Sequence, residues 1–163
     1  MTRVYTRRLV HRKWGDFRIC CAKDPLMPHS PLGWLDFLVP KDAASRRIAS
    51  DIAYGPNPRH RLDLYGPKRS VGPVPLLLFV YGGGWDSGDR TEYSFAGRAL
   101  ASLGFLVAVA DYRVFPEVIF PSFVEDLAQA ANWLLANGAQ HGGDPNRVFL
   151  AGHSAGYCRS GQM

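Results

Sequence analysis

Residues 74–81 read VPLLLFVY, an apolar run with no alternation between apolar and polar positions. A strand with this pattern is typical of a parallel sheet that is covered on both faces. Two further apolar runs follow it, FLVAVA at residues 105–110 and RVFLA at residues 147–151. Segments of helical periodicity separate the three strands, which indicates right-handed βαβ units. We therefore expect an α/β fold with a mostly parallel sheet and helices on both faces.

Two helices are predicted between these strands. The first spans residues 92–103 and would turn apolar side chains that include Leu103 toward the sheet. The second runs from Ser122 to about Asn137. Ser122 is followed three positions later by Glu125, which is the capping-box pattern of a helix N-terminus.

An antiparallel hairpin is predicted ahead of the parallel strands. Its strands are residues 47–54 and 59–65, joined by the turn Gly55-Pro56-Asn57-Pro58. Polar and apolar residues alternate in the second strand, which predicts one buried and one exposed face. The pair Gly66-Pro67 is expected to end that strand.

The N-terminal residues 1–30 differ in composition from the rest of the chain. They hold seven basic and two acidic residues, whereas residues 31–163 hold twelve of each. We expect residues 1–30 to form an irregular basic arm and residues 31–163 to form one α/β domain. A basic arm on a neutral domain does not favour nucleic-acid binding, although contact of the arm with nucleic acid or an anionic membrane stays as an alternative.

Composition excludes several other classes of protein. No apolar run reaches the about 18 residues of a membrane-spanning helix, so we expect no transmembrane segment. The three cysteines, two of them adjacent at Cys20 and Cys21, form neither a disulfide framework nor a metal-ligand pattern. We expect no metal and no organic cofactor, and a cytoplasmic location is only a default.

The segment Gly152-His153-Ser154-Ala155-Gly156 follows the third buried strand directly. A serine in a G-x-S-x-G turn at the end of a buried strand takes strained backbone angles, and its hydroxyl stands exposed at the carboxyl edge of the sheet. Such a hydroxyl is placed for activation by a general base. The alternative is an ordinary glycine-rich turn between a strand and a helix.

A second glycine-rich segment, Tyr81-Gly82-Gly83-Gly84-Trp85, follows the first buried strand. Consecutive glycines let backbone N–H groups converge on one point, which is the geometry that stabilises an oxyanion. Phosphate binding is disfavoured, because neither the dinucleotide spacing nor a following Gly-Lys-Ser/Thr is present. The alternative interpretation of this segment alone is a flexible turn.

Together these motifs resemble the first half of an α/β-hydrolase of the hormone-sensitive-lipase-like and feruloyl-esterase-like carboxylesterases. The resemblance spans about residues 46–156, and the motifs occur in the family order. It departs from many members at Tyr81, where they have a histidine. The motifs that carry it are YGGGWDSGDR at 81–90, Asp111-Tyr112-Arg113 with Pro116-Glu117, Phe120-Pro121, Glu125-Asp126, Gly143-Asp144-Pro145 and Gly152 to Gly156.

The resemblance implies a role for each matching residue. It makes Ser154 the nucleophile for a small-molecule acyl ester, with an oxyanion hole made by the N–H groups of Gly83, Gly84 and Ala155. Trp85 would line the substrate pocket, although an aromatic side chain there also fits simple packing. Asp111 and Arg113 resemble a polar pair behind the site, and we expect them to be structural.

A serine nucleophile needs a histidine base and an acid, which follow the serine along the chain in this fold. Residues 155–163 contain no Asp, Glu or His. Of the upstream histidines, we expect His141 at the opposite end of the sheet, His153 turned away from the serine and His60 unsuited as a base. We therefore expect that the C-terminal strands are missing and that the chain alone is inactive. The alternative is a non-catalytic fragment that self-associates, or pairs with a partner, through the edge of strand 147–151.

Overall fold

The computed structural model describes residues 18–19 and 43–154. Its centre is a six-stranded sheet with the strand order β1-β6-β4-β5-β3-β2. Neighbouring strands among β1, β6, β4 and β5 are parallel, and β3 pairs antiparallel with both β5 and β2. The strands are β1 (Arg18–Ile19), β2 (Ser45–Ala53), β3 (Arg61–Pro67), β4 (Val74–Val80), β5 (Leu106–Ala110) and β6 (Gly143–Gly152).

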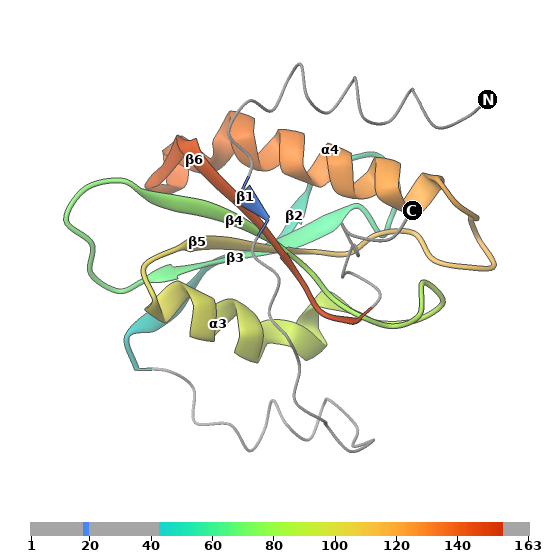
Figure 1. Cartoon of the computed structure of the whole chain (residues 1–163), viewed down its shortest axis with the longest axis horizontal. Coiled ribbons are helices and arrows are strands. Elements are labelled where there is room, and N and C mark those ends of the chain that lie inside the picture. The colour runs from blue at the N-terminus through green and yellow to red at the C-terminus, as the bar shows by residue number, and fades with distance from the viewer. Residues whose placement is uncertain (1–17, 20–42, 155–163) are drawn as a thin grey trace.

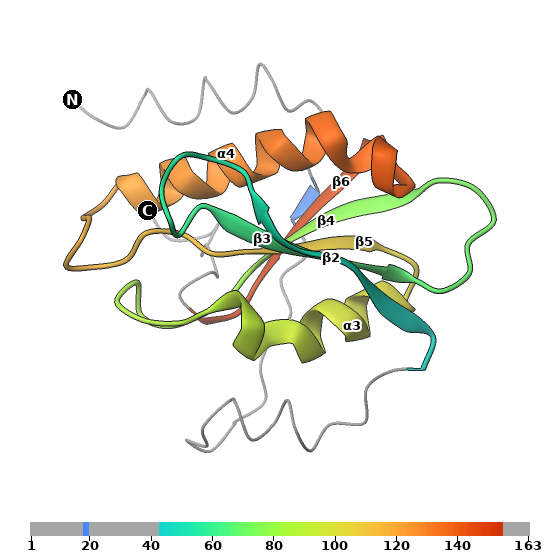
Figure 2. The same cartoon turned by 180° about the vertical axis from the view of Figure 1, so that it is seen from behind.

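Helices cover both faces of this sheet, as the sequence predicts. Helix α4 lies on one face and α3 on the other, which the two opposite views show (Figures 1 and 2). The core lies between these layers, and its side chains from β4 and β5 are almost completely buried. The helical segments are the 3₁₀ turn η1 (Arg90–Tyr93), α3 (Ser94–Ser102), α4 (Ser122–Asn137) and the 3₁₀ turn η2 (Gly138–His141).

Strand β3 differs from its prediction. The antiparallel pairing with β2 is confirmed, but residues 62–66 are all buried, so no face of β3 is exposed. Helix α3 packs on the face of β3 that carries Tyr65, and this is the face that the alternation predicts to be exposed. It ends at Pro67, which pairs with Ser45, so the predicted stop at Gly66-Pro67 is confirmed.

Strand β6 starts earlier than predicted. It begins at Gly143, and Gly143 and Asp144 pair with Val74 and Pro75. The register then shifts, so that Leu76 pairs with Val148. Residues 145–147 form this irregularity, which hides the start of the strand from a reading of apolar periodicity.

Helix α4 has the predicted bounds, Ser122–Asn137, whereas the first helix differs from expectation at its start and on its buried face. The predicted 92–103 segment divides into η1 and α3, and Leu103 caps α3 with 73% of its surface exposed. Of the predicted face, Phe95 and Leu100 are partly buried against the core, and Gly97 and Ala101 are fully buried because small residues let the helix approach the sheet closely. Ser122 is the first residue of α4 and Pro121 is the N-cap without a side-chain hydrogen bond, so the predicted capping box is wrong.

Within the predicted irregular arm, Arg18 and Ile19 form β1, which pairs with Phe149 and Leu150 of β6. That part of the expectation is wrong, because the free edge of a buried parallel strand pairs readily with extended backbone. The rest of the arm and residues 155–163 lie outside the described residues. In the part of the chain that the structure describes, no helix has the length and apolar character to cross a membrane.

Candidate active site

The two glycine-rich motifs meet at the carboxyl edge of the sheet. They follow β4 and β6, which are adjacent and parallel, and the N–H of His153 donates to the carbonyl of Val80 at 3.0 Å. A Cβ atom added to Gly82 would lie 2.8 Å from the Cβ of Ser154 and 3.0 Å from the carbonyl oxygen of His153. Only glycine at position 82 lets the loop approach the serine this closely.

Ser154 has the backbone that a sharp strand turn requires. Its φ is +53°, in the left-handed region that L-residues other than glycine rarely enter. The residue is exposed, at the end of β6. The predicted strain at the serine is thus present, whereas Ala155, the expected third oxyanion donor, lies outside the described residues.

The loop after β4 turns tightly over residues 83–87. Gly84 and Trp85 have φ values of +62° and +70°, and the carbonyl of Gly83 accepts hydrogen bonds from the N–H groups of Asp86 and Ser87, both at 3.1 Å. Within residues 43–154, the hydrogen bonds leave the N–H groups of Gly83 and Gly84 without an acceptor. Such donors are what an oxyanion hole needs.

Trp85 is half-buried and packs against aromatic side chains. Its ring stacks on Phe123 of α4 with centroids 4.4 Å apart and lies 5.4 Å from the ring of Tyr112. These contacts support the packing interpretation. A role for Trp85 in a substrate pocket stays a prediction.

A buried polar network anchors the start of the glycine loop. The hydroxyl of Tyr81 donates to Oδ1 of Asp111 at 2.8 Å, and the N–H of Arg90 donates to the same oxygen at 2.7 Å. The guanidinium of Arg90 also pairs with Asp111. Burial raises the pKa of Asp111, although the hydrogen bonds from Arg90 and Tyr81 oppose this effect. Burial also raises the pKa of the Tyr81 hydroxyl, so the phenol stays protonated and donates.

A second buried carboxylate, Asp126 on α4, binds Arg113. Oδ1 and Oδ2 of Asp126 accept from Nη2 and Nε of Arg113 at 2.6 and 2.9 Å, and Nε2 of His60 lies 3.1 Å from Oδ1. Burial disfavours the charged carboxylate, but the hydrogen bonds from Arg113 outweigh this, and the pKa of Asp126 lies below its ordinary value. Asp111 and Arg113 thus each pair with a different partner and not with each other, and a purely structural role for the two stays a prediction.

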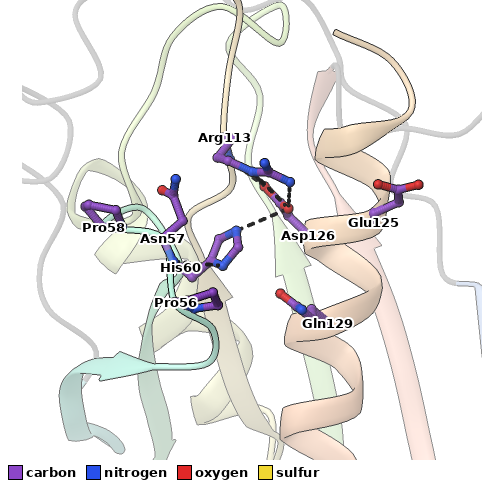
Figure 3. Close-up of a pocket in the computed structure, with 8 residues that line it drawn as sticks. All are labelled: Pro56, Asn57, Pro58, His60, Arg113, Glu125, Asp126 and Gln129. Carbon is purple, nitrogen blue, oxygen red and sulfur yellow. Dashed lines mark hydrogen bonds and ion pairs between the residues drawn. The ribbon is translucent and has the colours of Figure 1, made fainter. Parts of the chain in front are cut away.

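Next to Asp126 the structure has a polar cavity of about 540 Å³ that the sequence did not reveal (Figure 3). It lies between the β2–β3 turn and α4, and Ser154 is not among its lining residues. No sequence signal points to it, because its two walls are more than sixty residues apart along the chain. The lining residues are Pro56, Asn57, Pro58, His60, Arg113, Glu125, Asp126 and Gln129.

The described histidines were considered above as possible bases for Ser154, and the structure gives the position of each. Nδ1 of His153 lies 3.3 Å from the hydroxyl of Tyr93, and His60 lies against Asp126. His141 ends η2 just before β6, and so lies at the opposite end of that strand from Ser154, as expected. Among residues 18–19 and 43–154, no group of three or more His, Cys, Asp or Glu side chains is placed to hold a metal ion.

Comparison with solved structures defines the class of protein. Esterase B from Lactobacillus rhamnosis superposes with a TM-score of 0.65 at 33% identity, over 69% of this chain and 36% of the esterase. A bacterial heroin esterase gives a TM-score of 0.65 at 30% identity, over 77% of this chain and 40% of that chain. The fold is that of an α/β-hydrolase of the esterase type.

Sequence comparison gives the family. The BD-FAE model matches residues 62–158, and the chain belongs to the BD-FAE family. A probable isoprenylcysteine alpha-carbonyl methylesterase of Oryza sativa subsp. japonica is 40% identical over 138 residues, 85% of this chain and 31% of that protein. Esterase LipC of Mycobacterium tuberculosis is 37% identical over 107 residues, 64% of this chain and 27% of LipC. The relatives are carboxylic ester hydrolases, and the chain spans less than a third of the length of each.

Alanine at position 82 should separate the two motifs. The added Cβ overlaps Ser154 and the backbone of His153, so the loop or the serine turn must shift. We expect Gly82→Ala to slow labelling of Ser154 by a fluorophosphonate about 100-fold and to destabilise the fold by about 1–3 kcal/mol. The control is Gly72→Ala in an exposed loop, where φ is +88° and no atom lies within 4 Å of the new Cβ. Equal labelling rates for the two variants would contradict the close approach.

Proposed function

We propose that the chain carries the nucleophile and oxyanion hole of a serine carboxylesterase that acts on small-molecule acyl esters. The observation that carries this proposal is the position of Ser154, on a left-handed turn against Gly82, the residue before two glycines whose N–H groups have no acceptor within residues 43–154. The esterase relatives support the reaction class.

The chemistry follows from this arrangement. The oxygen of Ser154 attacks the acyl carbon while a base takes its proton, and the carbonyl oxygen becomes an oxyanion held by the N–H groups of Gly83, Gly84 and Ala155. The tetrahedral intermediate then expels the alcohol, which receives a proton, and leaves an acyl group on Ser154. Attack by water releases the acid and restores the hydroxyl. Trp85 would border the acyl or alcohol group.

A polypeptide of these 163 residues should nevertheless turn over slowly. Nδ1 of His153 lies against the hydroxyl of Tyr93 and His60 lies against Asp126, and residues 155–163 supply neither a histidine nor an acid. Loss of the base and the acid of a triad costs on the order of 10⁴–10⁶ in rate. Added imidazole supplies a base from solution and should raise the rate in proportion to its concentration.

The test is covalent labelling. The chain is incubated with a fluorophosphonate, with and without imidazole, and peptides are mapped by mass spectrometry; hydrolysis of p-nitrophenyl acetate is followed in parallel. We expect one phosphonyl group on Ser154, formed faster with imidazole, and weak ester hydrolysis without it. Absence of the adduct in both conditions would reject the nucleophile, and robust hydrolysis without imidazole would reject the need for an added base.

A second candidate is a non-catalytic chain that associates through the edge of the sheet. Of the ten residues of β6, Phe149 and Leu150 pair with β1, and in the part of the chain that the structure describes the rest of this edge has no strand beside it. On this hypothesis, size-exclusion chromatography with light scattering shows dimers or larger species at micromolar concentration. A monodisperse monomer that melts cooperatively would reject it.

A further inference from the structure

Arg59, in the turn between β2 and β3, reaches across to the residues that flank the glycine loop. Its Nε donates to the carbonyl of Tyr112 at 2.8 Å. Its Nη2 donates to the carbonyl of Gly88 at 2.8 Å and to the hydroxyl of Tyr81 at 3.2 Å. One half-buried guanidinium therefore binds both the first and the last residue of the segment 81–88.

The two ends of this segment already touch. A Cβ atom added to Gly88 would lie 2.7 Å from the ring of Tyr81 and 3.0 Å from the carbonyl oxygen of Gly82. The hydroxyl of Tyr112 donates to the carbonyl of Tyr81 at 2.9 Å. Tyr81, Gly88 and Tyr112 thus hold the two ends of the loop together, and we call these three residues the loop anchor. Arg59 contacts all three.

Charge neutralisation does not explain this side chain. Among the described residues, no carboxylate lies within ion-pair distance of Arg59, whereas Arg90 beside it pairs with Asp63 and Asp111. The acceptors of Arg59 are two main-chain carbonyls and a phenol. A planar guanidinium binds several acceptors in fixed directions, and a lysine ammonium, as a point charge on a flexible stem, does not.

We propose that Arg59 is a positioning residue for the glycine loop, residues 81–88. It does not touch the substrate. It fixes the loop anchor, and so holds the N–H groups of Gly83 and Gly84 where the oxyanion forms. This role rests on the proposed function of Ser154 and the loop. Small displacements of the N–H donors of an oxyanion hole cost large factors in rate. A loosened loop anchor should therefore slow acylation of Ser154 without weakening substrate binding.

The experiment compares Arg59→Met and Arg59→Lys with Arg147→Met in the 163-residue chain. Arg147 is a matched control, because it also donates to a main-chain carbonyl, that of Pro73, which lies before the start of β4 and so at the end of that strand away from the glycine loop. Hydrogen exchange of the amides of residues 82–88 reports loop order without any need for catalysis. Fluorophosphonate labelling of Ser154 with added imidazole gives the maximal rate and the half-saturating concentration.

For Arg59→Met we expect about tenfold faster exchange in 82–88 and about tenfold slower maximal labelling at an unchanged half-saturating concentration. Arg59→Lys should recover part of both effects, and it carries the test if the methionine variant does not fold. Arg147→Met should leave both unchanged. Unchanged exchange and labelling in a folded Arg59 variant would overturn the proposal. Faster exchange in a chain whose wild type forms no adduct on Ser154 would support the loop contact and reject the proposed function.

Discussion

Replacing Ser154 by alanine should remove the phosphonyl adduct completely, from one group per chain to none. The variant should also reduce imidazole-stimulated ester hydrolysis to the rate of imidazole in buffer. The physical reason is that Ser154 stands exposed at the end of β6, against the glycine loop. In a hydrolase with a complete triad, loss of the nucleophile costs about 10⁶ in kcat. Intact-mass spectrometry and a p-nitrophenyl ester assay measure the two effects.

The matched control is Ser102→Ala, which removes another exposed serine hydroxyl. Ser102 lies at the end of α3 and its hydroxyl donates to the carbonyl of Ala99, away from the glycine loop. This variant should form the adduct at the wild-type rate. An adduct that persists in Ser154→Ala, or disappears in Ser102→Ala, would show that a different side chain reacts.

Replacing Asp126 by alanine should lower the free energy of unfolding by about 3–5 kcal/mol, which is more than we expect for Gly82→Ala. The carboxylate is only 2% exposed and accepts the guanidinium of Arg113 through two oxygens, with His60 beside it. It also accepts from the N–H of Arg113 at 2.9 Å. Without it the N–H of Arg113 loses its acceptor, and the buried imidazole of His60 loses the carboxylate beside it. Denaturant unfolding at neutral pH measures the change.

The pH dependence of that loss has a defined sign. Because hydrogen bonds hold the pKa of Asp126 below its unfolded value, its contribution is present above about pH 4 and is lost as the pH falls through the folded pKa. The wild type and Asp126→Ala should therefore converge in stability on acidification. Asp144→Ala is the control, since Asp144 pairs with Arg147 at the exposed start of β6 and should change stability far less. A loss for Asp126→Ala that does not depend on pH would contradict the ion pair.

Some features of the site follow from local sequence. The apolar runs at 74–81 and 105–110 predict buried strands because side chains there avoid water on both faces. The serine turn at Gly152–Gly156 and the triple glycine follow two such strands, and strands of a parallel sheet end at one edge. Their meeting was predictable for that reason, and the 2.8 Å approach at Gly82 confirms it.

Other features depend on contacts that local patterns do not encode. The alternation in β3 indicates an exposed face, but α3 packs on that face and buries it. The start of β6 is hidden by a shift in register, and the N-cap of α4 is set by the chain path before it and not by Ser122.

By itself, the sequence determined which motifs follow which buried strands, the tight turn at Ser154 and the layered α/β architecture. It could do so because hydrophobic periodicity and glycine spacing are local patterns that extend over a few residues. Only the tertiary structure decided which polar groups pair. Asp126 with Arg113 and His60, and Arg59 with Tyr81, Gly88 and Tyr112, join segments that strand order brings together across the sheet. A buried polar group takes the partner that the packing places within hydrogen-bond distance, and that choice is made when the layers close.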